Sequence, residues 1–253
     1  MILPKVKERH VTHPDREVNR ITVRSPRIKQ PLKLAVVADL HDGVFEDVRH
    51  ELAKCDAILI LGDLIDRHSG GYERGAKFLE AAPDIAPTFY AIGNHEWRHP
   101  RINEYWPLVE KSGVTVLDDA FVDFGGIVIG GLSSRADKKA PVPFVAQMAK
   151  RPEFRLLMCH HPEYYPRHIA PHDIDLTLSG HAHGGQVRIG KQGLYAPGQG
   201  LLPRLTSGFY DGGRLLVSRG MTNATWAPRI RCKCELIILR LEPAEMPNEE
   251  MKK

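Results

Sequence analysis

Seven polar side chains of this 253-residue sequence are of the types that hold divalent metal ions, and they come from five separate segments. All are carboxylate, amide or imidazole groups, and none is a thiolate. Mixed nitrogen and oxygen ligands suit manganese, iron or zinc, and a pair of such ions could assist hydrolysis. The seven residues are Asp39, His41, Asp63, Asn94, His160, His181 and His183.

An apolar, β-favouring run ends just before each of these segments. LKLAVVA precedes Asp39, AILILG precedes Asp63, TFYAIG precedes Asn94, and RLLMC and DLTLSG precede His160 and His181. Near-continuous apolar runs are typical of strands covered on both faces, and the ligand sites of such sheets lie off the strand ends. We therefore expect five strands to carry the polar groups to one edge of one sheet.

The rest of the pattern first alternates strands with helices and then continues as short strands. Strands are predicted near 33–38, 57–61, 88–92, 114–117, 120–124, 127–132, 155–159, 215–219 and 235–241. Helices are predicted near 72–82, ending at Pro83, near 142–150, and near 101–112, where Pro107 allows one helix or two short turns. This order predicts an α/β fold, a four-layer α/β/β/α sandwich of two mixed sheets.

Residues 1–242 are expected to form a single domain. Within it, residues 1–32 would form a hairpin, with strands near 4–11 and 18–25, and a lead-in to the first core strand. Residues 243–253 are polar and proline-broken, which predicts a disordered tail.

The composition is that of a globular chain with a mild positive charge. The hydrophobic content is 42% and the formal charge is +4. Nine lysines and arginines against three acids in the first 33 residues form a basic N-terminal strip. This strip could contact nucleic acid or an anionic surface, but the solvated face of an edge strand is the favoured interpretation.

No secretory h-region and no apolar stretch near the ~20 residues of a membrane span is found in the sequence. The four cysteines, Cys55, Cys159, Cys232 and Cys234, form no CxxC pair, and reduced thiols are expected. We therefore expect the cytoplasm as the compartment.

The ordered motifs resemble those of the calcineurin-like metallophosphoesterases over roughly residues 33–241. The motifs are Asp39-Leu40-His41, Gly62-Asp63, Gly93-Asn94-His95-Glu96, His160 and Gly180-His181-Ala182-His183. The resemblance implies two divalent metal ions, the first held by Asp39, His41 and His183 and the second by Asn94, His160 and His181, with Asp63 bridging them.

The same resemblance implies hydrolysis of a phosphodiester or phosphomonoester by a metal-bridging hydroxide. His95 would then be a catalytic group that binds neither metal, and it would protonate the leaving oxygen or stabilise charge. Glu96 would orient a ligand histidine from outside the ligand set, and Asp66 would do similar work. The family pattern, a ligand histidine two residues before a proline, selects His160 over His161, which is expected to point to the opposite face.

The segment from Ser179 to Val187 is similar to the bacterial branch of small phosphodiesterases with the GHxHGGQ motif. Substrate-binding residues are not identified by the sequence, although Arg135, Trp97 and Tyr164 lie near the motifs. Two other functions stay open as alternatives. One is a metal-dependent nuclease that acts on DNA or RNA, and the other is a non-catalytic scaffold with the same fold, against which the complete ligand set argues.

Overall fold

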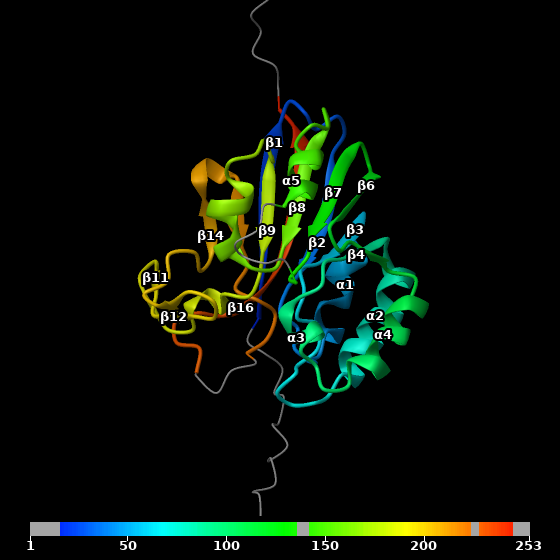
Figure 1. The fold of residues 1–253 in the computed structure, drawn as a ribbon, viewed down its shortest axis with the longest axis vertical. Coiled ribbons are helices and arrows are strands. Elements are labelled where there is room, and N and C mark those ends of the chain that lie inside the picture. The colour runs from blue at the N-terminus through cyan, green and yellow to red at the C-terminus, as the bar shows by residue number, and fades with distance from the viewer. Residues whose placement is uncertain (1–15, 136–141, 224–227, 245–253) are drawn as a thin grey trace, which may run out of the picture.

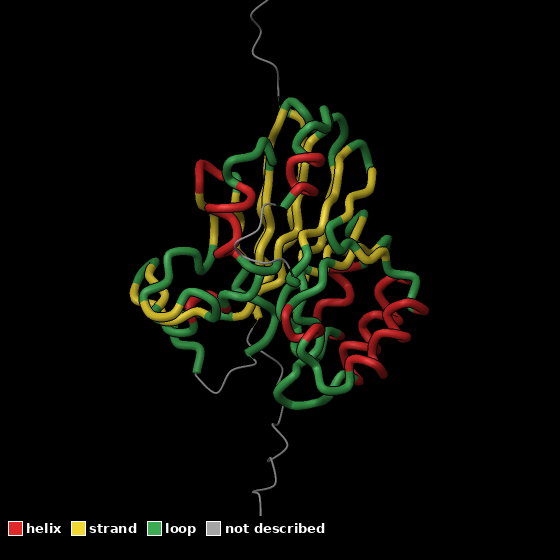
Figure 2. The backbone as a smooth tube through the Cα atoms, viewed as in Figure 1, coloured by secondary structure: helices red, strands yellow, loops and turns green. Residues whose placement is uncertain are grey.

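The computed structural model describes residues 16–135, 142–223 and 228–244, which form two six-stranded mixed sheets stacked face to face (Figures 1 and 2). The first sheet has the order β1 (Arg16–Ser25), β16 (Cys234–Pro243), β2 (Leu32–Val37), β3 (Ala57–Ile60), β4 (Thr88–Tyr90) and β5 (Thr115–Val116). The second has the order β14 (Gly208–Tyr210), β15 (Leu215–Val217), β9 (Leu176–Ser179), β8 (Phe154–Cys159), β7 (Ile127–Leu132) and β6 (Ala120–Phe124).

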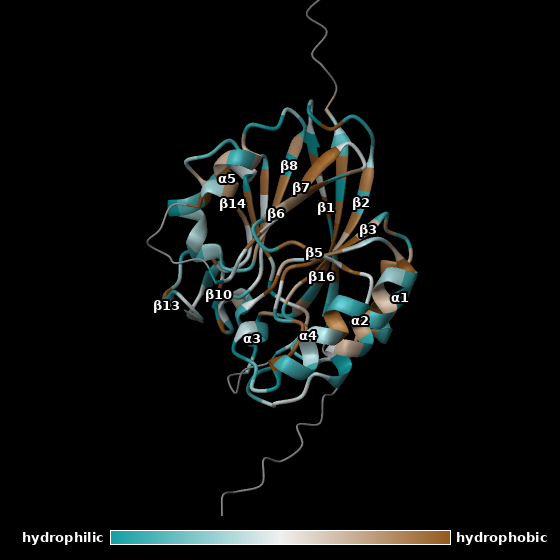
Figure 3. Ribbon diagram, turned by 45° about the vertical axis from the view of Figure 1, so that its right-hand side comes forward, coloured by the Kyte–Doolittle hydropathy of each residue, from teal (hydrophilic) through white to brown (hydrophobic). Residues whose placement is uncertain are grey.

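Helices cover the outer face of each sheet. Helices α1 (Arg49–Leu52), α2 (Glu73–Ile85) and α4 (Ile102–Lys111) pack on the first sheet, and α5 (Pro143–Met148) packs on the second. The apolar strands of both sheets stand out in Figure 3 against the more polar helices. The predicted four-layer α/β/β/α sandwich is confirmed.

The burial of alternate residues explains why the core strands are apolar throughout. Leu34 and Val36 of β2 enter the core between the two sheets, whereas Ala35 and Val37 enter the core under the helices. Successive side chains of a strand point to opposite faces, so a strand covered on both faces must be apolar at every position.

Pro83 does not end its helix as predicted, and at Pro107 the structure decides between the two alternatives. Helix α2 continues through Pro83 to Ile85, and α4 is one helix that contains Pro107. Pro83 lies in the last turn of α2, so it interrupts little of the helix. Pro107 is exposed, and a carbonyl left without its helical partner there can bond to water.

The N-terminal prediction is confirmed in part. Strand β1 occupies the predicted position near 18–25, but its partner is β16, in parallel. The other arm of the expected hairpin, near 4–11, and residues 245–253 of the expected tail lie outside the described residues. Within the part of the chain that the structure describes, no helix is long and apolar enough to cross a membrane.

The described arginines of the basic N-terminal strip are paired with acids. Arg16 lies 2.9 Å from Asp47, and Arg20 lies 2.9 Å from Glu51. Arg24 and Arg27 lie 2.7 Å from Glu242 and Asp175. These pairs offset the charge of the four described arginines, and contact with nucleic acid has no support from them.

Candidate metal centre

The seven predicted residues follow the C-terminal ends of strands in both sheets. Asp39, Asp63 and Asn94 follow β2, β3 and β4 of the first sheet, whereas His160 and His181 follow β8 and β9 of the second. The expectation of one edge of one sheet was therefore wrong. Parallel strands of the two stacked sheets end at the same end of the sandwich, and the site lies between the two sheet ends.

The structure brings all seven side chains together in two adjoining buried groups. Asp39, His41 and His183 form one group, and Nε2 of His41 lies 3.3 Å from Nε2 of His183. Asp63, His160, His181 and Asn94 form the other.

The contacts of Asp63 join these two groups. Oδ2 of Asp63 lies 3.1 Å from Nε2 of His160 and 4.0 Å from Nε2 of His41. The amide oxygen of Asn94 lies 3.3 Å from the same His160 nitrogen. Asp63 therefore lies between the two groups.

Five of the seven residues have a left-handed backbone, which non-glycine residues rarely adopt. The φ angles are 53° for Asp39, 47° for His41, 52° for Asp63, 64° for His181 and 47° for His183. Each such residue costs about 1–3 kcal/mol and persists only when its surroundings enforce it. Strain of this kind gathers at functional sites, where it aims several side chains at one point.

Hydrogen bonds and glycines hold this strained backbone in place. The Asp39 carboxylate accepts the backbone N–H of His181 at 3.0 Å, which joins the two sheets directly. Gly93 and Gly180 allow the close approach, because a Cβ on Gly93 would lie 2.3 Å from the Asp63 nitrogen and one on Gly180 would lie 2.7 Å from an Asp39 carboxylate oxygen. The glycines of the motifs are thus required by packing against the acids.

The contacts of His160 test whether a cation fits among these groups. Its Nδ1 lies 2.8 Å from the carbonyl oxygen of Leu61, so Nδ1 carries the proton and donates it. When Nε2 of His160 carries no proton, its lone pair faces the oxygens of Asp63 and Asn94, which are acceptors too. Three acceptors that converge without a donor are a fitting cradle for a divalent cation.

Burial and crowding displace the pKa values of these groups. Burial raises the pKa of the Asp39 carboxyl and lowers the pKa of His41. For His160, burial opposes the charged form, but the Asp63 carboxylate outweighs it and raises the pKa. A compact set of acids and imidazoles with such opposed shifts is typical of a functional site.

His95 lies beside the centre and is held by Asp66. Its Nδ1 lies 3.3 Å from the Asp66 carboxylate, and its Nε2 lies 3.8 Å from Asp63. Burial opposes the charged form of His95, but Asp63 and Asp66 outweigh it and raise its pKa. The Asp66 carboxylate therefore contacts His95, which is not one of the seven predicted ligands.

Glu96 differs from its predicted part. Among the described residues, its carboxylate is hydrogen-bonded to backbone N–H groups and to the Tyr90 side chain, and no hydrogen bond joins it to a ligand histidine. The carboxylate accepts the N–H groups of Asp63 at 3.0 Å, Leu64 at 2.6 Å and Gly93 at 2.8 Å. Because Asp63 has a strained backbone, Glu96 supports the loop that presents it.

His161 was expected to point away from the site, but it lies against it. Its ring centroid is 4.3 Å from that of His181, and its Nδ1 lies 3.2 Å from the Glu163 carboxylate. Nε2 of His181 lies 3.9 Å from the same carboxylate. The turn that begins at Pro162 breaks the strict alternation on which the prediction rested. The His-His-Pro-Glu run was the only sign of this pair in the sequence.

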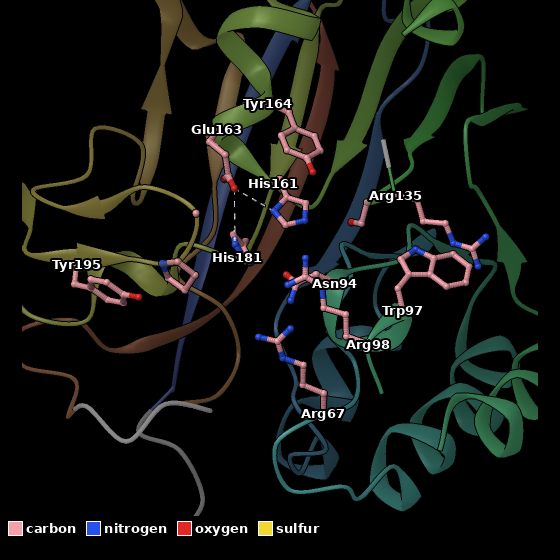
Figure 4. Close-up of a pocket in the computed structure, with 13 residues that line it drawn as sticks. Arg67, Asn94, Trp97, Arg98, Arg135, His161, Glu163, Tyr164, His181 and Tyr195 are labelled. Atoms are coloured by element: carbon pink, nitrogen blue, oxygen red, sulfur yellow. Dashed lines mark hydrogen bonds and ion pairs between the residues drawn. The ribbon is translucent and has the colours of Figure 1, made fainter. Parts of the chain in front are cut away.

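A pocket with a volume of about 590 Å³ opens beside Asn94 and His181 (Figure 4). Three arginines line it: Arg67, Arg98 and Arg135. The guanidinium group of Arg135 lies 3.2 Å from the centre of the Trp97 ring, a cation–π contact. Glu163 is the one acidic residue among the lining residues. The pocket therefore favours anions, which the sequence indicated only through Arg135. Lys138 and Lys139 of the same loop lie outside the described residues.

Comparison with known proteins adds the following. Residues 32–185 match the family model described as calcineurin-like phosphoesterase. The chain is 32% identical over 245 residues to an uncharacterized metallophosphoesterase of Campylobacter jejuni, a match that covers 89% of this chain and 63% of that protein. It is 29% identical over 179 residues to an uncharacterized metallophosphoesterase of Helicobacter pylori, covering 64% of this chain and 47% of that protein. The chain thus spans less than two thirds of these two relatives. It is also 29% identical over 235 residues to the phosphodiesterase YaeI of Escherichia coli, covering 83% of this chain and 82% of that protein.

Proposed function

This chain belongs to the calcineurin-like phosphoesterase family, and we propose that it is a dinuclear metal-dependent enzyme that hydrolyses phosphate esters. The observation that carries the proposal is the convergence of seven buried nitrogen and oxygen ligands from both sheets, five of them on strained backbone. The name of the Escherichia coli relative favours phosphodiesters as the substrate class.

The residues divide between two cations as their contacts suggest. Asp39, His41 and His183 would hold the first cation. His160, His181 and Asn94 would hold the second, and Asp63 would contact both. Two divalent cations supply an activated water molecule and neutralise the charge on the phosphoryl oxygens. The ligand set suits manganese, iron or zinc.

The chain's own residues do the remaining work. His95, oriented by Asp66, holds a proton that it can deliver to the leaving oxygen. Arg67 and Arg98 attract the anionic substrate to the pocket and hold it against the ligands. Trp97 and Arg135 form a wall on which a flat group of the substrate can stack.

The alternatives are weaker on the same evidence. A nuclease needs a surface for a long polyanion, and the described arginines of the N-terminal strip are paired with acids. A scaffold would not need the strained ligand set. All four cysteines are free and buried, which agrees with a reducing compartment such as the cytoplasm.

Hydrolysis of bis(p-nitrophenyl) phosphate and p-nitrophenyl phosphate with added Mn²⁺ tests the proposal. The wild type should turn over at least the diester, and Asp63→Asn should lose about 100-fold or more in kcat, because both cations lose a ligand charge. Asp84→Asn, at an exposed acid in the last turn of α2 that precedes the N-terminal end of β4, opposite the end that carries Asn94, is the matched control. Failure to hydrolyse either ester with Mn²⁺, Co²⁺, Ni²⁺, Fe²⁺ or Zn²⁺ would refute the proposal.

A further inference from the structure

Residues 187–205 lie shortly after His181 and His183 in the chain and form a lobe of two short hairpins. Strand β10 (Arg188–Ile189) pairs with β11 (Gln192–Gly193), and β12 (Tyr195–Ala196) pairs with β13 (Gly200–Leu201). In Figure 1 the lobe projects from the side of the sandwich. Its base is bonded to the segment after His183, because Leu194 donates to the Gly185 carbonyl at 3.1 Å and Arg188 donates to the Gly184 carbonyl at 2.7 Å.

The lobe exposes large apolar side chains out of proportion to its length. Seven large hydrophobic residues are exposed in ranges 16–135, 142–223 and 228–244, and four of them lie in the lobe. These four are Ile189 (66% exposed), Tyr195 (48%), Leu201 (81%) and Leu202 (65%). A fifth, Ile230, is bridged to Val187 at the base of the lobe. A cluster of exposed apolar residues of this kind marks a contact surface.

The charges of the lobe are all of one sign. Residues 187–205 contain Arg188, Lys191 and Arg204 and no acidic residue. Lys191 and Arg204 are exposed, and no described carboxylate forms an ion pair with either of them. A surface with exposed cationic and apolar side chains and no acidic ones is complementary to the headgroup–acyl boundary of an anionic lipid layer. The apolar side chains enter the acyl region there and the cations contact the phosphates.

We propose that the lobe docks the protein on an anionic lipid bilayer. Leu201, Leu202 and Ile189 would enter the headgroup–acyl boundary, and Lys191 and Arg204 would contact lipid phosphates. Ile189 ends β10, Leu201 ends β13 and Leu202 follows it, so these side chains lie at strand ends rather than along one flat sheet face, which suits a fluid bilayer better than a second copy of the chain.

Docking would also place the pocket at the lipid surface. Tyr195, Pro197 and Gly198 of the lobe line the pocket that opens beside the metal centre. A phosphoester carried on a lipid headgroup would then lie close to the site. The docking itself does not depend on hydrolysis, so its test needs no turnover.

Co-sedimentation of the purified chain with vesicles measures the docking directly. One set of vesicles is phosphatidylcholine with about one third phosphatidylglycerol, and the other is pure phosphatidylcholine. The wild type should bind the anionic set preferentially. Leu201→Ser with Leu202→Ser should weaken binding on the order of tenfold for each leucine. Lys191→Gln with Arg204→Gln should weaken it roughly fivefold per charge.

Leu108→Ser is the matched control, since Leu108 is 40% exposed on α4 and lies outside the lobe. It should leave binding unchanged, and all variants should keep the wild-type melting temperature because the changed residues are exposed. The inference is overturned if the wild type binds neither vesicle, if pure phosphatidylcholine binds equally well, or if Leu108→Ser matches the lobe variants. A dimer in light scattering that the leucine variants dissociate, without vesicle binding, would instead assign the lobe to self-association.

Discussion

Replacing Glu96 by glutamine should weaken the hydrogen bonds that hold the loop around Asp63, although the side chain keeps almost the same size. The buried carboxylate accepts the N–H of Leu64 on one oxygen, and those of Gly93 and Asp63 on the other. A glutamine has one acceptor oxygen, so in either orientation at least one of these buried N–H groups faces an amide N–H. One orphaned buried donor costs about 1–3 kcal/mol, and the remaining bonds lose their charge assistance, which roughly halves their strength. We therefore expect the free energy of unfolding to fall by about 2–4 kcal/mol.

Urea unfolding at pH 8 measures this change, and calorimetric titration with Mn²⁺ measures its effect on the site. Because the strained Asp63 would lose its support, Mn²⁺ affinity should fall about 10–100-fold. Glu80→Gln, at an exposed acid on α2, is the control and should stay within about 0.5 kcal/mol of the wild type. A Glu96→Gln variant that unfolds within about 0.5 kcal/mol of the wild type and binds Mn²⁺ normally would refute the assigned part of Glu96.

Three further predictions follow from the site. His95→Ala should lower kcat for the diester about 10²–10⁴-fold without changing the amount of bound Mn²⁺. Asp66→Asn should lower kcat less, about 10–100-fold. Loss of metal from the His95→Ala variant in elemental analysis would argue against a catalytic role for His95. Gly220→Ala should destabilise the fold more than Gly212→Ala in thermal melts. Both glycines have a left-handed backbone, with φ of 78° at Gly220 and 62° at Gly212, but only at Gly220 would an added Cβ lie 2.8 Å from Asp39. Equal losses of melting temperature in the two variants would contradict this close packing. Removal of metal with EDTA should lower the melting temperature, and Mn²⁺ at about 100 times its Kd should restore about 2.7 kcal/mol of stability for each cation bound. A melting temperature that neither EDTA nor Mn²⁺ changes would refute cation binding at the centre.

The sandwich could be predicted well because its determinants are local. The apolar runs before Asp39, Asp63 and His160 identify strands covered on both faces, and each strand was found within a few residues of its predicted place. The helix end predicted at Pro83 was wrong, and the choice between one helix and two turns at Pro107 was left open. Both depended on where the proline lies in its helix and on whether a freed carbonyl meets water, which only the folded chain decides.

The contacts around the centre could not be predicted in the same way. Glu96 was assigned to a histidine, because acids near ligand histidines often orient them, but the fold brings backbone N–H groups of the neighbouring loop to its carboxylate instead. His161 was placed on the opposite face by strand alternation, and the turn after it returned its ring to His181. Such partners are distant or irregular in sequence, and no local pattern encodes them.

The sequence by itself indicated the family of this protein, since the types and order of the seven candidate ligands and His95 form the motifs that resemble those of calcineurin-like phosphoesterases. The tertiary structure decided how that centre is built. Stacking two sheets face to face, with their strand ends at one end of the sandwich, brings ligands from both sheets into contact and forces Asp39, Asp63 and His181 into strained conformations. It also set the arginine-lined pocket beside the centre, because Arg67, Arg98 and Arg135 come from segments that meet only after the sheets have packed.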